Sequence, residues 1–377
     1  MTKLETTYYT KAHQIPDEVF VNLGCASSFY FEKYFLEAFA KANPSIEHRY
    51  LIIHSNQNPQ ALVVIQQLNV AIEGAPQKLS LQNKAARALQ GYLNNKEVAI
   101  ALCGNLFLSG NYGVYIKKGV PQTHIYGHIA QEMKSLKASK KASVFFLKDF
   151  TQQELPMVEV VSKKQFQPFS VEPNMLLKLV WKDYDAYKNA LRSKYRVKVN
   201  KADSLSESLV RKNMDSQSIE EHQDRLQELY HNITDRSFFT SVEMNMATYV
   251  LLKERFRESV ILNTYWLHNK MVGFATAFKV GDKLEAHYVG MDYEYNKEFS
   301  IYPRILNDYV RMGFELGCTE VNFGRTASEI KSTLGAIPED LICYVRHRRT
   351  AANLLFRPLI KHIKMTEYKQ HWPFKEL

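Results

Sequence analysis

The sequence predicts two α/β domains in tandem, each built on a mixed α+β sheet. The chain has 377 residues, more than one hydrophobic core usually supports. Its composition, 45% hydrophobic and 23% charged, is that of an ordinary globular protein. The same order of elements also occurs twice along the chain, and this argues for two related domains. We expect a first domain at 1–165 and a second at 166–377, the second ending in a basic tail.

The first half follows the order helix, hairpin, helix, strand, glycine. An amphipathic run at 29–42 has aromatic residues at helical spacing. Two β-rich runs, 49–54 and 61–65, flank a polar tip and predict a hairpin. A helical segment at 81–93 then leads to an apolar strand at 98–103, which ends before a glycine.

The second half repeats this order. It predicts an amphipathic helix, a three-stranded meander, a long helix and a last strand, at 220–233, 260–267, 271–278, 283–290, 301–316 and 320–323. Gly317 closes the long helix as a left-handed C-terminal stop, and Gly324 follows the last strand. We expect the polar stretch 156–173 to connect the two domains.

Bulk features exclude several classes of protein. No apolar run approaches the roughly 20 residues of a membrane span, and the first residues lack the apolar core of a signal peptide. The four cysteines are far apart and form no CxxC pair, so we expect reduced thiols, no metal site and a cytoplasmic location.

The positive charge is concentrated near the C-terminus. Residues 344–377 carry eight Lys or Arg against two Glu, which is +6 of the formal +10. Such a tail suits a polyanionic partner: a phosphorylated substrate, RNA including tRNA, or an anionic membrane surface. A solvated basic helix that aids solubility is the alternative.

Three stretches carry a resemblance to a known family. They are the basic segment 191–201, the Gly290-Met-Asp292 turn, and Phe323-Gly-Arg-Thr-Ala-Ser-Glu-Ile-Lys-Ser-Thr-Leu-Gly335. In this order they resemble the GNAT superfamily, and within it the Fem-like branch with tandem GNAT domains, which includes peptidoglycan aminoacyltransferases. The resemblance implies two GNAT-like domains, an acyltransferase activity, and aminoacyl-tRNA or acyl-CoA as the acyl donor.

One segment departs from the wider GNAT pattern. GNAT acetyltransferases bind the coenzyme A pyrophosphate on a glycine turn at the start of the long helix, because phosphate must approach bare backbone amides there. Here the matching segment is 297–302, with Ser300 and Tyr302 in place of glycines. Tyr302 is expected to crowd that site, so acyl-CoA fits poorly, while an anion could still bind amides near Ser300.

Candidate bases lie on and just after the third meander strand. Strict alternation puts Glu285, His287 and Val289 on one face. His287 has the side chain that titrates nearest to neutral pH, although a structural strand histidine is the commoner case. Glu285 could orient or replace it. Asp292 follows the strand and either reaches the site or caps the next turn.

Candidate binding residues are cationic. Arg325 and Lys331 follow the last strand, at the sheet end where α/β proteins commonly bind ligands. Arginine suits bidentate recognition of phosphate or carboxylate, and lysine suits point-charge contact. Arg192 and Arg196 belong to the basic segment that, by the resemblance, lies near the substrate. A plain surface ion pair or a solvated helix face is the alternative for each.

Three functions remain open from the sequence. The first is an N-acyl- or aminoacyltransferase acting on the amine of a phosphorylated or nucleotide-linked cell-envelope intermediate. The second is a coenzyme A-dependent GNAT N-acetyltransferase of a small amine. The third is a non-catalytic RNA- or membrane-binding protein with a GNAT-like fold.

If Arg325 holds an anionic substrate group, Arg325→Ala should weaken binding by about 1.5–3 kcal/mol, as for a hydrogen bond to a charged group. This is roughly a ten- to hundred-fold loss of affinity. Arg325→Lys should recover only part of it, because an ammonium cannot reproduce the guanidinium fork. Calorimetry with a UDP-linked muropeptide precursor measures the loss. A lower melting temperature with unchanged binding would instead identify a structural arginine.

Overall fold

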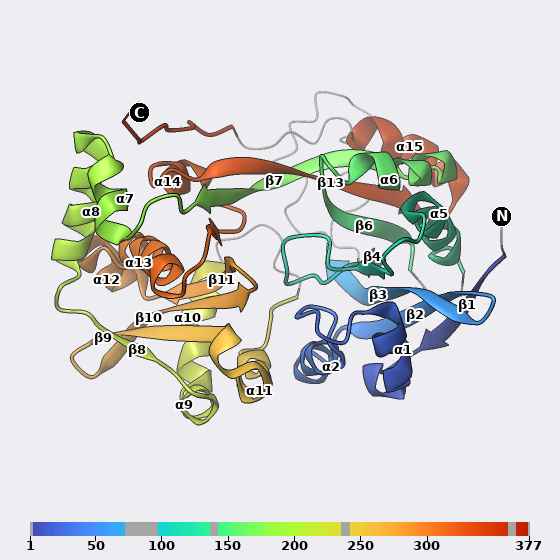
Figure 1. The fold of residues 1–377 in the computed structure, drawn as a ribbon, viewed down its shortest axis with the longest axis horizontal. Helices are drawn as coiled ribbons and strands as arrows, with labels where there is room; N and C mark the ends of the chain where they lie inside the picture. The colour runs from blue at the N-terminus through green and yellow to red at the C-terminus, as the bar shows by residue number, and fades with distance from the viewer. Residues whose placement is uncertain (1–2, 72–96, 136–141, 235–241, 361–366, 376–377) are drawn as a thin grey trace. The chain divides into compact units, whose positions relative to one another are not determined.

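The computed structural model describes residues 3–71, 97–135, 142–234, 242–360 and 367–375 and divides into two compact units (Figure 1). The first comprises Met1–Val171, Ser241–Met244 and Asp340–Met365, and the second Glu172–Thr240, Asn245–Glu339 and Thr366–Leu377. The first crossing lies six residues beyond the boundary expected at 165 and 166. Residues 340–365, expected in the second domain, cluster with the first unit instead.

The first unit contains a sheet with the strand order β1-β2-β3-β4-β6-β13, and β5 pairs with β3. All pairs are antiparallel except β4 with β6. The strands are β1 (Leu4–Tyr9), β2 (Glu47–Ser55), β3 (Asn58–Ala71), β4 (Glu97–Cys103), β5 (Val114–Ile116), β6 (Val144–Thr151) and β13 (Ile337–His347). Its helices include α1 (Asp17–Leu23), α2 (Lys33–Ala42), α5 (Gln122–Glu132), α6 (Leu155–Val158) and α15 (Thr350–Ile360).

The second unit has the strand order β8-β9-β10-β11-β12-β7. Its pairs are antiparallel except β11 with β12. The strands are β7 (Gln167–Lys178), β8 (Val210–Asn213), β9 (Val260–Leu267), β10 (Lys270–Val280), β11 (Lys283–Met291) and β12 (Glu320–Asn322). Its helices are α7 (Tyr184–Ala190), α8 (Ser193–Leu205), α9 (Ser216–Glu221), α10 (Gln223–Thr234), α11 (Ala247–Phe256), α12 (Tyr293–Phe299), α13 (Ile301–Glu315) and α14 (Ser328–Ser332).

The two sheets follow one plan. In each, four antiparallel strands are followed by a parallel pair and then by an antiparallel last strand. The last strands come from elsewhere in the chain, since β13 follows the second meander and β7 precedes it. The predicted tandem arrangement of mixed α/β domains is therefore confirmed.

Most predicted elements form close to their expected bounds, including both hairpins, the meander and the long helix. The helix expected at 81–93 lies outside the described residues. The stretch 156–173, expected as a polar connection between the domains, does contain the first crossing between the two units, but much of it is structured and buried. That stretch contains a 3₁₀ helix (Glu159–Lys164) and the start of β7, and Val158, Val161 and Phe166 are fully buried. Those apolar residues pack into the core of the first unit, so tertiary contacts outweigh the local polarity.

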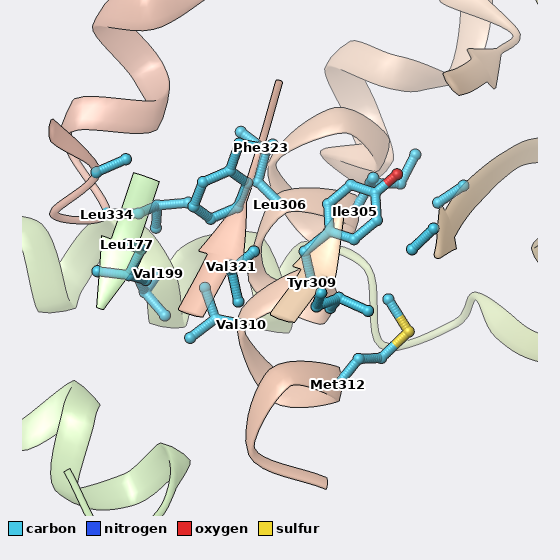
Figure 2. Close-up of a cluster of buried hydrophobic side chains, with 14 of the residues drawn as sticks. Leu177, Val199, Ile305, Leu306, Tyr309, Val310, Met312, Val321, Phe323 and Leu334 are labelled. Carbon is cyan, nitrogen blue, oxygen red and sulfur yellow. The ribbon is translucent and has the colours of Figure 1, made fainter. Parts of the chain in front are cut away.

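The second unit packs helices on both faces of its sheet. Residues 273, 275 and 277 of β10 face α13, which Figure 2 shows contributing Ile305, Leu306, Tyr309 and Val310 to a buried cluster. On the opposite face, Gly290 of β11 lies against the α10 backbone. A Cβ at Gly290 would come 2.8 Å from the carbonyl carbon of Leu229 and would collide with the Phe274 ring. This close approach explains the glycine in the Gly-Met-Asp turn.

Gly290→Ala should therefore lower the free energy of unfolding by about 1–3 kcal/mol, the usual cost of overpacking a core. Gly127→Ala is the control, because it lies inside α5 with its nearest neighbour at 3.8 Å. That change should stabilise by roughly 0.5–1 kcal/mol, as alanine in a helix interior generally does. Urea titration measures both. A Gly290→Ala protein as stable as the parent would contradict this packing of α10 on β11.

Candidate functional site

The second unit differs from the first at its parallel strand pair. In the first unit, β4 and β6 pair up to Cys103, the last residue of β4. In the second unit, β11 and β12 share only three pairs, which end at Glu285 with Asn322, although β11 continues to Met291. No described strand pairs with that side of the last six residues of β11. Its backbone groups there face the region beside the end of β12.

Contacts of β12 explain the divergence. The Asn322 amide bonds Glu285 Oε2 at 2.7 Å through Nδ2 and accepts from the Gly324 amide at 2.8 Å. The next residues bond to β7 instead of β11, since Phe323 N donates to Met175 O and Met175 N donates to Gly324 O. Gly324 adopts a φ of 67°, which glycine reaches without strain. The chain therefore turns away from β11 at this point.

Lys331 holds the turn in place. Its Nζ donates to the carbonyl oxygens of Phe323, Gly324 and Arg325 at 2.8, 3.2 and 2.5 Å. Burial lowers the pKa of Lys331 to about 7, while three acceptors match the three N–H groups of an ammonium. Lys331 was a predicted substrate-binding residue, but here its side chain stabilises the loop. Arg325 of that loop is half-buried and close enough to Tyr288 for their charges to interact.

A β-bulge in β11 changes the predicted alternation of faces. Ala275 pairs with Val289 and Ala277 with Ala286, so both His287 and Tyr288 lie opposite Thr276. The Thr276 hydroxyl accepts from Tyr288 N and donates to Tyr288 O, both at 2.9 Å. Since directly paired residues share a face, Val289 lies on the α13 face and not beside Glu285. The strict alternation expected for 285, 287 and 289 is therefore wrong.

The bulge keeps His287 on the face covered by α10 and α11. Its Nδ1 lies 2.7 Å from the Tyr249 hydroxyl, which lies 2.7 Å from Thr276 Oγ1. Its ring packs 4.9 Å from the Phe278 ring. The imidazole is thus held by a structural network of hydroxyl groups, and this favours an orienting role over proton transfer to a ligand.

Glu285 is the carboxylate at the end of the paired strands. It pairs with Phe278 and therefore shares the face of α10 and α11. Burial raises the pKa of Glu285 to about 7, although the hydrogen bond from Asn322 and the charge of Lys283 oppose this. A carboxylate with such a pKa can accept a proton near neutral pH.

Asp292 serves as a helix cap. Its side chain accepts from the Glu294 amide at the start of α12 and from Arg225 and Lys270 at 3.3 and 3.2 Å. Burial raises the pKa of Asp292, but hydrogen bonds, of which the one from Lys270 has the largest effect, lower it below its usual value. An ion-paired carboxylate with a lowered pKa is a weak base, so the capping alternative describes Asp292 better.

The start of α13 offers little to an anion. Tyr302 N donates to Asn296 Oδ1 at 2.9 Å, and Pro303 has no N–H. Ser300 precedes the helix in a left-handed conformation with a φ of 47° and makes no side-chain cap. The Tyr302 side chain is largely buried against the core, and burial raises its pKa. Among the first three residues of α13, the backbone N–H of Tyr302 is bonded to Asn296 and Pro303 has none. This leaves the N–H of Ile301 for an anion.

A cavity of about 570 Å³ lies beside this helix start, within the second unit. Its walls come from α8, α13, α14 and the C-terminal segment 367–375: Tyr195, Lys198, Val199, Lys201, Ala202, Ser300, Pro303, Leu306, Asn307, Ala327, Glu329, Ile330, Thr333, Leu334 and His371. Of the predicted binding residues only Ser300 lines it. Arg192 precedes α8 and is exposed, and Arg196 is half-buried elsewhere on that helix.

Two residues of the predicted basic run, Lys198 and Lys201, line the cavity, whereas Arg192 and Arg196 of the same run do not. Lys198 and Lys201 were part of the same basic run, and helical periodicity alone did not identify the face that meets α13. His371 gave no signal, because its place depends on packing between segments far apart in the chain. The described residues contain no cluster of three side chains arranged to hold a metal ion. Within them, no helix combines the length and apolarity needed to cross a bilayer.

Comparisons with known proteins agree on the fold. FemX superposes with a TM-score of 0.53 and 11% identity, over 85% of this chain and 92% of that one. A tandem GNAT protein from the clavulanic acid biosynthesis pathway gives 0.54 and 9%, over 92% and 99%. L-PGS from Bacillus licheniformis gives 0.51 and 10%, over 92% and 97%. The sequence matches no protein-family model and no curated protein. The chain has the tandem GNAT-type fold of the Fem-like kind that the motifs predicted.

The raised pKa of Glu285 predicts a dependence of stability on pH. Because its folded pKa of about 7 exceeds the ordinary 4.5, its contribution is fully present below pH 4.5 and is lost as the pH rises through 7. Glu285→Gln cannot ionise and keeps an acceptor for Asn322. Its stability relative to the parent should rise from pH 5 to pH 8, by on the order of 3 kcal/mol in the limit of the full shift. Urea titrations measure this, and a difference independent of pH would show that Glu285 is solvated.

Proposed function

We propose that the second unit is an N-acyl- or aminoacyltransferase acting on the amine of a phosphorylated or nucleotide-linked cell-envelope intermediate. One observation carries this proposal: the strands of the parallel pair diverge directly beside a half-buried carboxylate, Glu285. The fold that the chain shares with FemX and with a tandem GNAT protein supports acyl transfer as the class of reaction.

The chemistry assigns one task to Glu285. An ammonium ion is not nucleophilic, so the acceptor must lose a proton before its nitrogen attacks the acyl carbon. Glu285, ionised above about pH 7, takes that proton directly or through one water. The new C–N bond gives a tetrahedral oxyanion, which collapses as the donor oxygen or sulfur leaves. Amides on the free edge of β11 are suited to stabilise that oxyanion.

The start of α13 favours an aminoacyl donor over acyl-CoA. Binding a pyrophosphate at a helix start requires several free amides, and here Tyr302 N is bonded to Asn296 while Pro303 has none. Aminoacyl-tRNA does not require this cradle, because its phosphates are met by basic surfaces. We therefore propose aminoacyl-tRNA as donor and expect acyl-CoA to bind weakly.

Membrane contact through the basic tail and a cytoplasmic location belong to the same proposal. The net charge of +10 suits polyanionic substrates. Part of the tail, 361–366, lies outside the described residues. Residues 367–375 are anchored in the second unit through Phe374, so removing the tail would also damage that unit.

Transfer of a labelled amino acid from aminoacyl-tRNA to a UDP-linked muropeptide precursor tests the proposal. The parent protein should form product, and its kcat/KM should rise with pH through about 7 as Glu285 ionises. Glu285→Gln should lower kcat by roughly 10²–10⁴-fold, the usual contribution of a general base. Its melting temperature should not fall at pH 8.

Two other results would overturn the proposal. Product formed from acetyl-CoA and a small amine, with none from aminoacyl-tRNA, would identify a coenzyme A-dependent acetyltransferase. A melting temperature raised by tRNA, without transfer from any donor, would identify a nucleic-acid-binding protein, since a ligand of the folded state stabilises it by mass action.

A further inference from the structure

We propose that the cavity between α8, α13 and α14 binds a diphosphate group, that the side chains of Lys198 and Lys201 hold it, and that His371 positions the opposite wall. This inference rests on the proposed function, because it names the groups that would bind the anionic part of its substrate. This mode of binding differs from phosphate binding by backbone amides at a helix start, because the charged contacts come from side chains on one face of α8.

Lys198 and Lys201 bring two positive charges to the cavity wall. Lys198 and Lys201 are three residues apart on α8, so they project from one face with Cβ atoms about 5–6 Å apart. Both line the cavity, and neither has a carboxylate within ion-pair distance among the described residues. The acidic residue of α8, Asp203, is instead bonded by Arg311 and by Asn307 Nδ2.

The other cations around α13 are already paired. Arg304 contacts Asp308 at 3.0 Å, and Arg311 contacts both Asp308 and Asp203. They are therefore satisfied by protein carboxylates, while Lys198 and Lys201 of α8 are left to a ligand. An anion with several oxygens can bridge two such ammonium groups.

His371 is a positioning residue in the cavity wall. Its Nδ1 lies 3.2 Å from the Tyr195 hydroxyl and its Nε2 lies 3.4 Å from Glu329 Oε1, and all three residues line the cavity. Its backbone amide donates to Ser332 Oγ at 3.1 Å. The pairing with His371 also engages Glu329, the one carboxylate of the cavity wall, and so reduces its repulsion of an anion.

Packing of the C-terminal segment fixes His371 against α8. Phe374 fills the space that the absent side chain of Gly335 leaves, and its ring lies 4.5 Å from that of Trp181. Pro373 O accepts from Arg192 N at 2.8 Å, at the residue that precedes α8. The segment and the helix that carries the lysines are thus joined at one point.

The cavity also limits the kind of ligand. Its volume of about 570 Å³ is within the range of small-molecule sites. Apolar side chains, among them Val199, Leu306 and Ile330, also line the cavity. The shared chemistry is therefore a diphosphate joined to an apolar or ring-shaped group, from either a nucleotide or an isoprenoid lipid.

Calorimetric titration of the full chain with inorganic pyrophosphate, UDP and geranyl diphosphate tests the site. The Lys198→Gln/Lys201→Gln protein should bind at least about tenfold more weakly, as expected when charge-assisted hydrogen bonds are lost. The affinity of this variant should also depend less on salt between 50 and 300 mM NaCl, because it lacks two of the charges that added salt screens. His371→Asn should weaken binding while keeping that salt dependence.

The matched control is Lys182→Gln/Lys212→Gln, which removes the same charge from the second unit outside the cavity. It should bind like the parent. Tighter binding of UDP or of geranyl diphosphate identifies the source of the diphosphate. Equal losses in both double variants, or no binding of any probe by the parent, would overturn the site.

Transfer activity separates this inference from the proposed function. Loss of diphosphate binding in the lysine variant, in a protein that transfers no acyl group, would leave the site and reject the function. Normal transfer and normal diphosphate binding by the lysine variant would reject the site alone.

Discussion

The short parallel ladder between β11 and β12 is the constraint on which the second unit depends. It ends because Asn322 bonds Glu285 and Gly324 with one side-chain amide, and because the next residues bond to β7. Lys331 then holds three successive carbonyl oxygens of the turn. The first unit has the same strand order but keeps its parallel strands paired to the end of β4. Two related sheets therefore differ in strand pairing through a few hydrogen bonds at one strand end.

The bulge in β11 determines which side chains accompany the divergence. By placing two residues opposite Thr276, it keeps His287 on the face of Glu285 and sends Val289 to the face of α13. Thr276 and Tyr249 satisfy the polar groups that the bulge exposes. In this apolar setting burial raises the pKa of Glu285 into the range useful for a base, while exposed ion pairs lower that of Asp292. Two neighbouring carboxylates thus have different chemistry because their surroundings differ.

We propose that phosphate recognition in this unit uses side chains in place of backbone amides. A glycine turn at a helix start binds phosphate through amides, but here Asn296 and Pro303 remove two of those amides. In the proposed site, two lysines of α8 replace those amides, and His371 from the C-terminal segment forms part of the cavity wall. The side chains of the proposed site come from separate elements. The specificity of the cavity for its ligand would therefore depend on how the C-terminal segment packs against α8.

The sequence by itself determined the periodic elements and their tandem order, because hydrophobic spacing and glycine stops are local properties. It also located the last strand, which ends before Gly324, and the basic segment 191–201, most of which forms the first part of α8. Only the tertiary structure decided that Lys331 binds carbonyl oxygens, that Asp292 caps a helix, and that Lys198 and Lys201 face a cavity with His371. These roles depend on burial and on partners far away in the chain, which no local pattern encodes.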